Sequence, residues 1–187
     1  MAYLSRKALE EIGFRSIGEN VKVSDKASIY NPECISIGDH SRIDDFCIIS
    51  GWVSIGKYVH IAPFCLVAGG EVGVEMDDFS GLAYGVQVFS QSDDYTGASL
   101  TNPTVDDIYK LERKEKVSIG RHVIVGASSI VFPGVVLAEG CSVGAMTLVN
   151  KSTKPWGIYV GNPAKRVKER KKDLLELEKS FMQEAGK

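Results

Sequence analysis

An aliphatic side chain recurs every six residues through most of this chain of 187 residues, and this spacing constrains the fold more than any other feature. The two unbroken runs are Ile37, Ile43, Ile49, Ile55, Ile61 and Val67, and then Ile119, Val125, Val131, Leu137, Val143 and Val149. A period of six matches neither an α-helix, with about 3.6 residues per turn, nor a βαβ unit of about thirty residues. It matches an all-β parallel solenoid, in which short strands stack on one another and bury the aliphatic column.

Small or β-branched residues stand four positions after each aliphatic residue, which predicts a second interior column. Cys47, Cys65 and Cys141 occupy this phase, so we interpret these thiols as interior fillers and not as nucleophiles. Glycine directly follows several aliphatic residues, as at Gly38 and Gly126. We interpret these glycines as relief from Cβ strain where the chain turns a sharp corner.

The composition excludes several classes of protein. A net charge of −2 provides no overall basic field to hold a nucleic-acid backbone. The longest apolar runs fall well short of the roughly 20 residues that a membrane span needs. Charges also interrupt the N-terminal residues, where a signal peptide requires an apolar stretch. We therefore expect a single cytoplasmic domain with no nucleic-acid partner and no membrane span.

Two insertions interrupt the repeat, and in a solenoid such insertions form outer loops that often lie at the binding face. Nine residues instead of six separate Val67 from Met76, which predicts a bulge at one corner. A longer insertion occupies residues 92–117. Loops of this length are usually functional or disordered, and we expect this one to protrude.

The last coil leads into Gly161-Asn162-Pro163-Ala164-Lys165-Arg166. Together with the repeat, this ending resembles the hexapeptide-repeat acyltransferases, which include the galactoside- and maltose-type O-acetyltransferases and the bacterial sugar N-acetyltransferases of surface-polysaccharide synthesis. The resemblance implies a left-handed parallel β-helix, a homotrimer with active sites between subunits, and acetyl-CoA as the acyl donor. The hand comes from the resemblance alone, because crossovers between parallel strands are otherwise overwhelmingly right-handed.

The resemblance covers about residues 17 to 170 and divides the chain into three segments. We expect residues 1–16 to form an N-terminal helical segment. Residues 17–160 are expected to form the left-handed β-helix, with its loop at 92–117. Residues 161–187 are then the coenzyme A-binding exit and a C-terminal helix.

Lys165 and Arg166 open a cationic stretch in a chain that is otherwise slightly acidic. Coenzyme A carries phosphate groups, and a charge-assisted hydrogen bond to such a group is worth about 1.5–3 kcal/mol. We therefore expect these two residues and Pro163 to bind the donor, the alternative being a solvated basic face. The resemblance also implies a donor groove lined by small corner residues, which here are Gly126, Ala127, Gly144 and Ala145.

The three histidines occupy different phases of the repeat. His40 and His122 stand three positions after their aliphatic residues, whereas His60 stands five after Ile55. A zinc site would need histidines that converge on one place, so we expect no metal. His60 lies directly before the nine-residue break, in a stretch similar to one where sugar N-acetyltransferases place a donor-contacting histidine. We predict that His60 is the general base.

The usual bases of the resembling enzymes are missing. Gly51 stands where the sugar N-acetyltransferases carry an Asp-His-Asp cluster, and residues 92–97 lack the histidine of the galactoside type. In one hypothesis His60 acts as the base, a role worth about 10²–10⁴-fold in rate, and Asp93 or Asp94 orients the acceptor or the imidazole. In the other, an amino-sugar acceptor needs no strong base and the carboxylates only bind it. We place Asp93, Asp94 and Tyr95 at the acceptor in both.

These features predict transfer of an acetyl group from acetyl-CoA to a hydroxyl or amino group of a sugar or nucleotide-linked sugar in surface-polysaccharide synthesis. The acceptor would attack the thioester directly, since the cysteines occupy interior positions. The alternative is a binding or structural solenoid that has lost its catalytic base.

Overall fold

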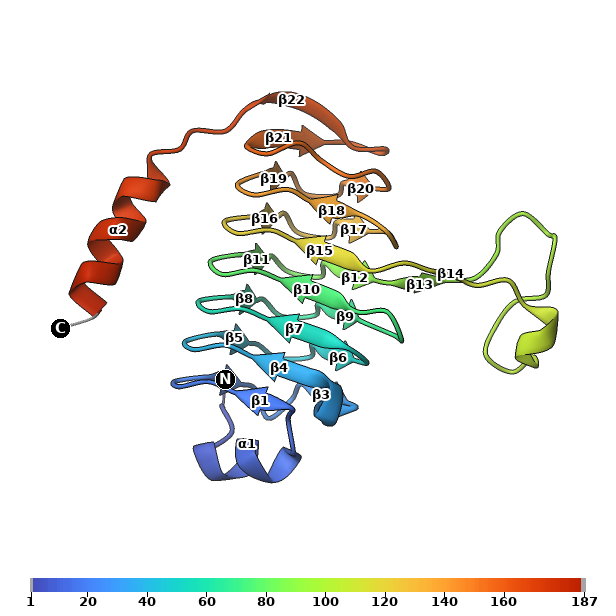
Figure 1. Ribbon diagram of the computed structural model, residues 1–187, viewed down its shortest axis with the longest axis horizontal. Helices are drawn as coiled ribbons and strands as arrows, with labels where there is room; N and C mark the ends of the chain where they lie inside the picture. The colour runs from blue at the N-terminus through green and yellow to red at the C-terminus, as the bar shows by residue number, and fades with distance from the viewer. Residues whose placement is uncertain (1, 186–187) are drawn as a thin grey trace.

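The computed structural model describes residues 2–185, and in it the chain winds into a three-sided coil of short strands (Figure 1). Consecutive strands pass from a first sheet to a second and a third before the next coil begins, so strands one coil apart pair in parallel. The coil is left-handed and consists of stacked parallel strands. The left-handed parallel β-helix implied by the resemblance is therefore confirmed.

Three sheets form the sides of the coil. In spatial order, the first sheet contains β1 (Ser16–Ile17), β4 (Ile35–Ile37), β7 (Val53–Ile55), β10 (Val74–Met76), β15 (Val117–Ile119) and β18 (Val136–Leu137). The second contains β2 (Lys22–Val23), β5 (Arg42–Ile43), β8 (His60–Ile61), β11 (Gly81–Leu82), β16 (Ile124–Val125), β19 (Ser142–Val143), β21 (Gly157–Val160) and β22 (Lys165–Glu169). The third contains β3 (Ser28–Tyr30), β6 (Ile48–Ser50), β9 (Leu66–Ala68), β12 (Gln87–Phe89), β17 (Ile130–Val131) and β20 (Leu148–Val149).

The six-residue repeat forms the core as predicted. Ile37 pairs in register with Ile55, and Ile55 with Met76, so equivalent side chains stack from coil to coil. All three are buried, and so are Cys47 and Cys141 in the second interior column, which consists of small and β-branched residues. The prediction that the cysteines fill the interior is confirmed. Each coil contributes a few aliphatic side chains worth about 1.5–3 kcal/mol apiece, so stacking provides the stability.

The glycines that follow the aliphatic residues have a different cause from the one expected. A Cβ on Gly38 would lie 2.6 Å from the carbonyl carbon of Gly56, and one on Gly126 would lie 2.5 Å from the backbone nitrogen of Ala145. Left-handed backbone conformations fall instead on bulky residues such as Tyr58 (φ 55°). The strain argument was therefore wrong, because glycine is required here by the close approach of successive coils.

The two ends of the coil are covered differently. Helix α1 (Arg6–Ile12) lies beneath the first coil, begins with a hydrogen bond from the Ala8 N–H to the Ser5 hydroxyl (3.2 Å), and inserts the buried Leu9 into the core. At the other end, β22 runs antiparallel to β21 and closes the second sheet. The predicted N-terminal helix is present, whereas the last strand was not anticipated.

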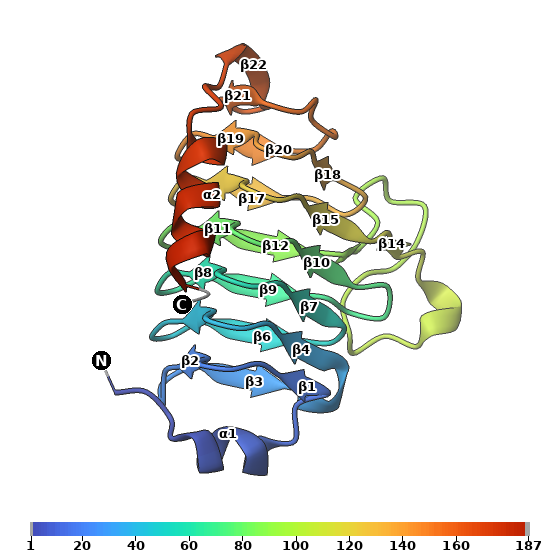
Figure 2. The same ribbon diagram turned by 60° about the vertical axis from the view of Figure 1, so that its left-hand side comes forward.

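Two segments project from opposite sides of the coil (Figure 1). One is the 92–117 insertion, which begins and ends in an antiparallel pair, β13 (Gln91–Ser92) and β14 (Arg113–Lys114). The other is α2 (Leu174–Ala185), which follows β22 and lies along the second sheet (Figure 2). Short 3-10 turns at Pro32–Cys34 and Asp107–Tyr109 complete the secondary structure. Within residues 2–185, no helix has the length and apolar character needed to cross a membrane.

Candidate active site

A column of small residues runs up the corner between the second and third sheets. We call it the small-residue corner, and its members are Ala62, Ala83, Gly126 and Gly144. The Ala62 N–H donates to the carbonyl oxygen of Leu82 (3.0 Å), the residue before Ala83, and the same bond recurs at each coil upward. Successive members therefore lie one strand spacing apart. Ala127 and Ala145 follow the two glycines at this corner, so four of the residues predicted to line the donor groove lie together.

Cations stand at the upper end of this corner. On β22, Lys165 pairs in register with Val160 and Arg166 with Tyr159, and Pro163 is exposed in the turn before them. Arg166 forms an ion pair with Glu169, while the Lys165 side chain is exposed. In sheet order β8 and β22 are five steps apart, or about 24 Å at about 4.8 Å per step. The corner is thus a long, narrow track that ends at two positive charges.

His60 stands at the lower end of the same track. It lies on β8, in register with Arg42 below and Gly81 above, and its side chain is 48% exposed. Its Nε2 lies 2.8 Å from Oδ2 of Asp44, whose side chain is 1% exposed. Since an ionised carboxylate only accepts hydrogen bonds, Nε2 is the donor, and in the neutral imidazole the lone pair lies on Nδ1. The imidazole is therefore oriented with its basic nitrogen available.

Asp44 is held by three partners from different elements. It accepts from Nε and Nη2 of Arg42 (2.8 and 2.7 Å), from the Tyr3 hydroxyl (3.1 Å) and from His60. Burial raises the pKa of this carboxyl, but the hydrogen bonds from Arg42 and His60 outweigh burial and lower it below the ordinary value. Asp44 thus remains ionised and keeps His60 in one tautomer.

Sequence reasoning missed Asp44, although one signal was visible. It directly follows Ile43, at the position that holds alanine or glycine in the coils above it. The Asp44 N–H donates to the carbonyl oxygen of Ile61 (3.0 Å), so Asp44 lies immediately below Ala62. A carboxylate in a column of small residues indicates a role that packing alone does not require.

The other two histidines lie at a different corner, between the first and second sheets. His40 stacks on Tyr58 with ring centroids 4.8 Å apart. His122 is buried, and its Nε2 lies 2.9 Å from Oε2 of Glu178 on α2. Burial and then the positive charge of Arg121 lower the pKa of His122. Within the described part of the chain, no group of three or more histidine, cysteine or acidic residues is placed to hold a metal.

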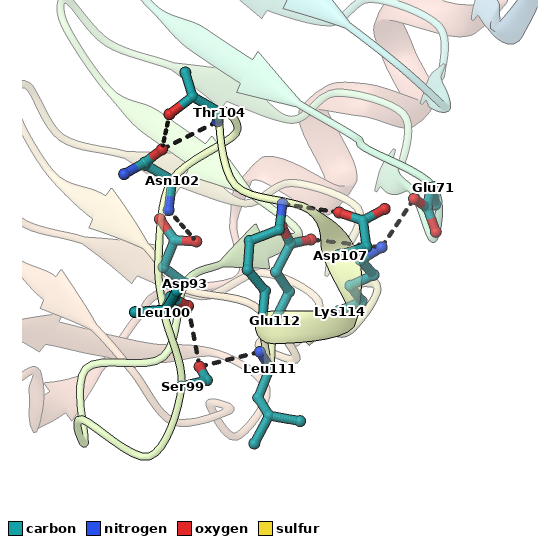
Figure 3. Close-up of polar contacts among 11 residues, drawn as sticks. Glu71, Asp93, Ser99, Leu100, Asn102, Thr104, Asp107, Leu111, Glu112 and Lys114 are labelled. Atoms are coloured by element: carbon teal, nitrogen blue, oxygen red, sulfur yellow. Dashed lines mark hydrogen bonds and ion pairs between the residues drawn. The ribbon is translucent and has the colours of Figure 1, made fainter.

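The predicted acceptor residues lie on the protruding loop, where Figure 3 shows Asp93. Within one chain this loop projects from the side of the coil opposite β8, the strand that carries His60 (Figure 1). Asp94 accepts from the backbone N–H groups of Thr96 (2.9 Å) and Ser99 (3.1 Å), and these bonds, with the Thr96 bonds foremost, lower its pKa. Asp93 accepts from the N–H of Asn102 (3.3 Å), and Tyr95 is 92% exposed. The acidic side chains of the loop therefore stabilise its conformation by accepting hydrogen bonds from its own backbone.

The base of the loop is tied to the coil by a salt bridge. Lys114 Nζ lies 2.8 Å from Glu71 Oε1, beside the turn that the nine-residue break forms between β9 and β10 (Figure 3). In that turn the Gly73 N–H donates to the Gly69 carbonyl oxygen (2.7 Å), as the predicted bulge requires. The two interruptions of the repeat thus lie next to each other, at the corner between the third and first sheets.

Known proteins match this chain along nearly its whole length. A family model described as bacterial transferase hexapeptide (six repeats) matches residues 34–69. The chain is 43% identical to a dTDP-4-amino-4,6-dideoxy-D-glucose acyltransferase of Escherichia coli over 183 residues, which cover 97% of this chain and 95% of that protein.

Solved structures of acyltransferases also match this chain along nearly its whole length. The N-acyltransferase AntD from Bacillus cereus, in complex with dTDP and 3-hydroxybutyryl-CoA, superposes with a TM-score of 0.97 at 48% identity, covering 99% of this chain and 98% of that one. A variant of AntD in complex with dTDP-4-amino-4,6-dideoxyglucose and coenzyme A also gives 0.97, at 49% identity and 98% coverage of both chains. A maltose O-acetyltransferase from Clostridium difficile 630 gives 0.59 at 20% identity, covering 89% of this chain and 74% of that one, and shares the fold alone.

Proposed function

The chain belongs to the hexapeptide-repeat acyltransferases, and we propose that it transfers an acyl group from a coenzyme A thioester to the amino group of a dTDP-linked amino sugar of the 4-amino-4,6-dideoxyglucose type. The observation that carries the proposal is the small-residue corner, a track that leads from two exposed cations to a histidine fixed by a buried carboxylate. A track of this shape suits a long, narrow donor with phosphates at one end and a reactive carbonyl at the other.

The donor lies along the small-residue corner in this proposal. Lys165 and Arg166 bind its phosphates through charge-assisted hydrogen bonds, and Pro163 shapes the turn beside them. The amide-rich arm passes Gly144, Ala145, Gly126 and Ala127, where the absence of bulky side chains lets it approach the backbone. The thioester carbonyl then lies near Ala83 and His60.

The chemistry is a direct displacement. The acceptor nitrogen attacks the thioester carbonyl carbon, the carbon–sulfur bond breaks, and the coenzyme A thiolate leaves. Nδ1 of His60 accepts the proton that the nitrogen loses and returns it to the departing sulfur. Cys47, Cys65 and Cys141 are buried in the core, so none of them is placed to carry the acyl group.

His60 is a better base than the loop carboxylates on physical grounds. Asp44 orients the imidazole so that Nδ1 is the nitrogen facing away from the carboxylate, whereas the backbone bonds of Asp94 lower its pKa below that of an ordinary, already weakly basic aspartate. We assign Asp93, Asp94 and Tyr95 to binding the acceptor.

The acceptor site requires more than one copy of the chain. Because the loop and His60 lie on opposite sides of one coil, Asp93 to Tyr95 reach a histidine only on a neighbouring subunit. A homotrimer, in which each loop extends over the next coil, brings the two halves together. We further propose that the enzyme acts in the cytoplasm, where acyl-CoA is present, and supplies N-acylated sugars for surface polysaccharides such as lipopolysaccharide.

The first experiment measures thiol release from acetyl-CoA in the presence of dTDP-4-amino-4,6-dideoxyglucose, with the mass of the product as proof of N-acylation. We expect release that depends on both substrates. Calorimetric titration with coenzyme A separates this proposal from a structural solenoid, because absence of binding at millimolar coenzyme A would leave only the latter.

The second experiment tests the base. For His60→Ala we expect kcat/KM to fall by about 100-fold, within the range usual for a general base. His40→Ala removes an exposed histidine from the other corner and should change kcat/KM little. A loss below about tenfold for His60→Ala would remove His60 as the base and favour an acceptor amine that needs none.

A further inference from the structure

Helix α2 lies over the outer face of the second sheet (Figure 2). Side chains of both line a cavity of about 730 Å³ between them. It extends across β8, β11 and β16, from the small-residue corner on one side to α2 on the other. At the small-residue corner the wall is formed by Ala62, Ala83 and Tyr84. On the opposite side it is formed by Leu174, Leu177 and Phe181 of α2. Its volume lies within the range of about 300–1,000 Å³ typical of ligand sites.

Helix α2 is held over this cavity by specific contacts. Glu178 pairs with Arg121 and lies 2.9 Å from Nε2 of His122. Phe181 packs edge-on against Tyr58 with ring centroids 5.2 Å apart. Before the helix, Nη1 of Arg170 donates to the carbonyl oxygen of His122 (2.6 Å). These contacts fix α2 on the far side of the cavity from the small-residue corner.

Most of the ionisable and hydroxyl groups along the cavity wall already have partners within the protein. Glu178 and Arg170 both bond to His122, and the Ser80 hydroxyl donates to the carbonyl oxygen of Asp77 (2.7 Å). The second ring nitrogen of His60 and the hydroxyls of Tyr58 and Tyr84 are the exceptions. A sugar or nucleotide would find few partners for its many polar groups on such a wall, which costs free energy, whereas an alkyl chain needs none.

Gly81 creates the open centre of the cavity. It lies on β11 between His60 and Ile124, its register partners on the neighbouring strands. Those two side chains point outward, since the residues that follow them, Ile61 and Val125, fill the core. A Cβ on Gly81 would meet only the carbonyl oxygen of His60, at 3.4 Å, so the fold does not require glycine here. Packing therefore gives no reason for the missing side chain.

We infer that this cavity receives the acyl chain of the coenzyme A donor and that Gly81 sets the longest chain accepted. The inference rests on the proposed function, which places the thioester at the corner beside Ala83 and His60. From there the chain extends over Gly81 towards Leu177, away from the attacking nitrogen. The two-carbon acetyl group fills little of this space, so donors longer than acetyl-CoA are accepted.

The test compares acetyl-, butyryl- and hexanoyl-CoA in the wild-type protein and in the series Gly81→Ala, Gly81→Val and Gly81→Leu. Discrimination of about 10- to 200-fold is usual when a hydrophobic pocket loses room for a methylene group. We therefore expect Gly81→Val to lower kcat/KM for butyryl-CoA by at least about tenfold and for acetyl-CoA by less than about threefold. Ser142→Val adds similar bulk one strand above Ile124, outside the cavity lining, and should leave the ratio unchanged.

A binding measurement accompanies the kinetics. By calorimetry, butyryl-CoA should bind the wild-type protein more tightly than coenzyme A does, and Gly81→Val should abolish this difference. Equal losses for all donors, a wild-type enzyme restricted to acetyl-CoA, or a raised KM for the amino sugar with unchanged donor preference would each overturn the inference. If no donor releases thiol in the wild-type protein, the proposed function itself fails, and the acyl cavity fails with it.

Discussion

Two corners of the coil share the same left-handed backbone conformation but differ in the side chains that they expose. We call the corner between the first and second sheets the aromatic corner, and its column contains His40, Tyr58, Phe79, His122 and Trp156. Ring centroids along it lie 4.8, 4.9 and 5.5 Å apart up to His122. At the equivalent position of the other corner, Phe46 stacks on Phe64 at 5.1 Å, and then the column changes to Gly85, Ser128 and Met146.

The backbone does not account for this change. Phe79 and Ser128 share a left-handed conformation, with φ of 57° and 58°. What differs is the side chain that this conformation presents outward. Stacked rings close the surface at the aromatic corner and give α2 a place to dock, whereas small residues leave a track at the other corner. The repeat therefore determines the coil, and the residue size at each corner decides whether the surface there is closed by stacked rings or left open.

The largest expected effect lies at the aromatic corner. Trp156 is buried there, and Lys172 lies over its ring at 5.4 Å. Truncating a buried tryptophan usually costs about 3–5 kcal/mol, so we expect Trp156→Ala to lower the free energy of unfolding in urea by about 3 kcal/mol. Met146→Ala, at the exposed position of the other corner, should change it by less than about 0.5 kcal/mol. Similar losses at both positions would contradict the distinction between the corners.

Adding a bulky side chain tests the small-residue corner. Ala83→Leu introduces bulk into the proposed donor track, and we expect kcat/KM for acetyl-CoA to fall by about 100-fold, equivalent to about 2.7 kcal/mol. Ala138→Leu is the matched control, because Ala138 also directly follows an inward leucine but lies at the aromatic corner. It should alter kcat/KM by less than about threefold while leaving coenzyme A affinity intact. If both variants lose activity equally, the track does not hold the donor.

The charged end of the track gives a smaller effect. Removing one charge-assisted bond to phosphate by Lys165→Ala should weaken coenzyme A binding by about tenfold, or about 1.4 kcal/mol. The dependence of affinity on salt concentration should also decrease, since one ionic contact is lost. Lys151→Ala removes an exposed lysine from the corner between the third and first sheets and serves as the control. If Lys165→Ala binds coenzyme A as tightly as the wild-type protein does, Lys165 does not bind the phosphates of coenzyme A.

Much of this arrangement follows from the sequence because it is periodic. The phase of Ile37 and its equivalents predicts the stacked parallel coil, the buried cysteines and the place of each interruption, whereas the hand of the coil came from the family resemblance. The same phase brings Gly126 and Gly144 to one corner, one coil apart. Periodic features are predictable because each coil repeats the environment of the one below it.

Features that join distant or non-periodic segments were not predictable. The bond between His60 and Asp44 depends on two side chains of neighbouring coils turning towards each other, and the repeat specifies only their backbones. Strand β22 and the docking of Glu178 depend on how the chain leaves the last coil. The prediction that Asp93 and His60 serve one active site came from the family resemblance, which places such sites between subunits. In one chain the loop that carries Asp93 and the strand that carries His60 lie on opposite sides of the coil, so a single chain does not test this prediction.

The smallest expected effect concerns the pH dependence of the aromatic corner. Burial, with the nearby positive charges of Arg121 and Arg170, lowers the pKa of His122, and the charge of Glu139 only partly opposes this. The folded state therefore binds fewer protons than the unfolded state at pH values just below the ordinary histidine pKa of about 6.5. Stability from this site is fully present above that pH and decreases as the pH falls through it.

His122→Gln should abolish this slope, because glutamine does not titrate but still offers an amide to Glu178. The measurement is the free energy of unfolding of the wild type and the variant between about pH 7.5 and about pH 5, where histidines titrate. The difference between the two should shift in favour of the variant as the solution becomes more acidic. His40→Gln, at the exposed end of the same column, controls for the loss of one stacked imidazole. A difference that stays constant with pH would mean that His122 is as readily protonated in the folded as in the unfolded chain, so that burial beside Arg121 does not disfavour its charged form.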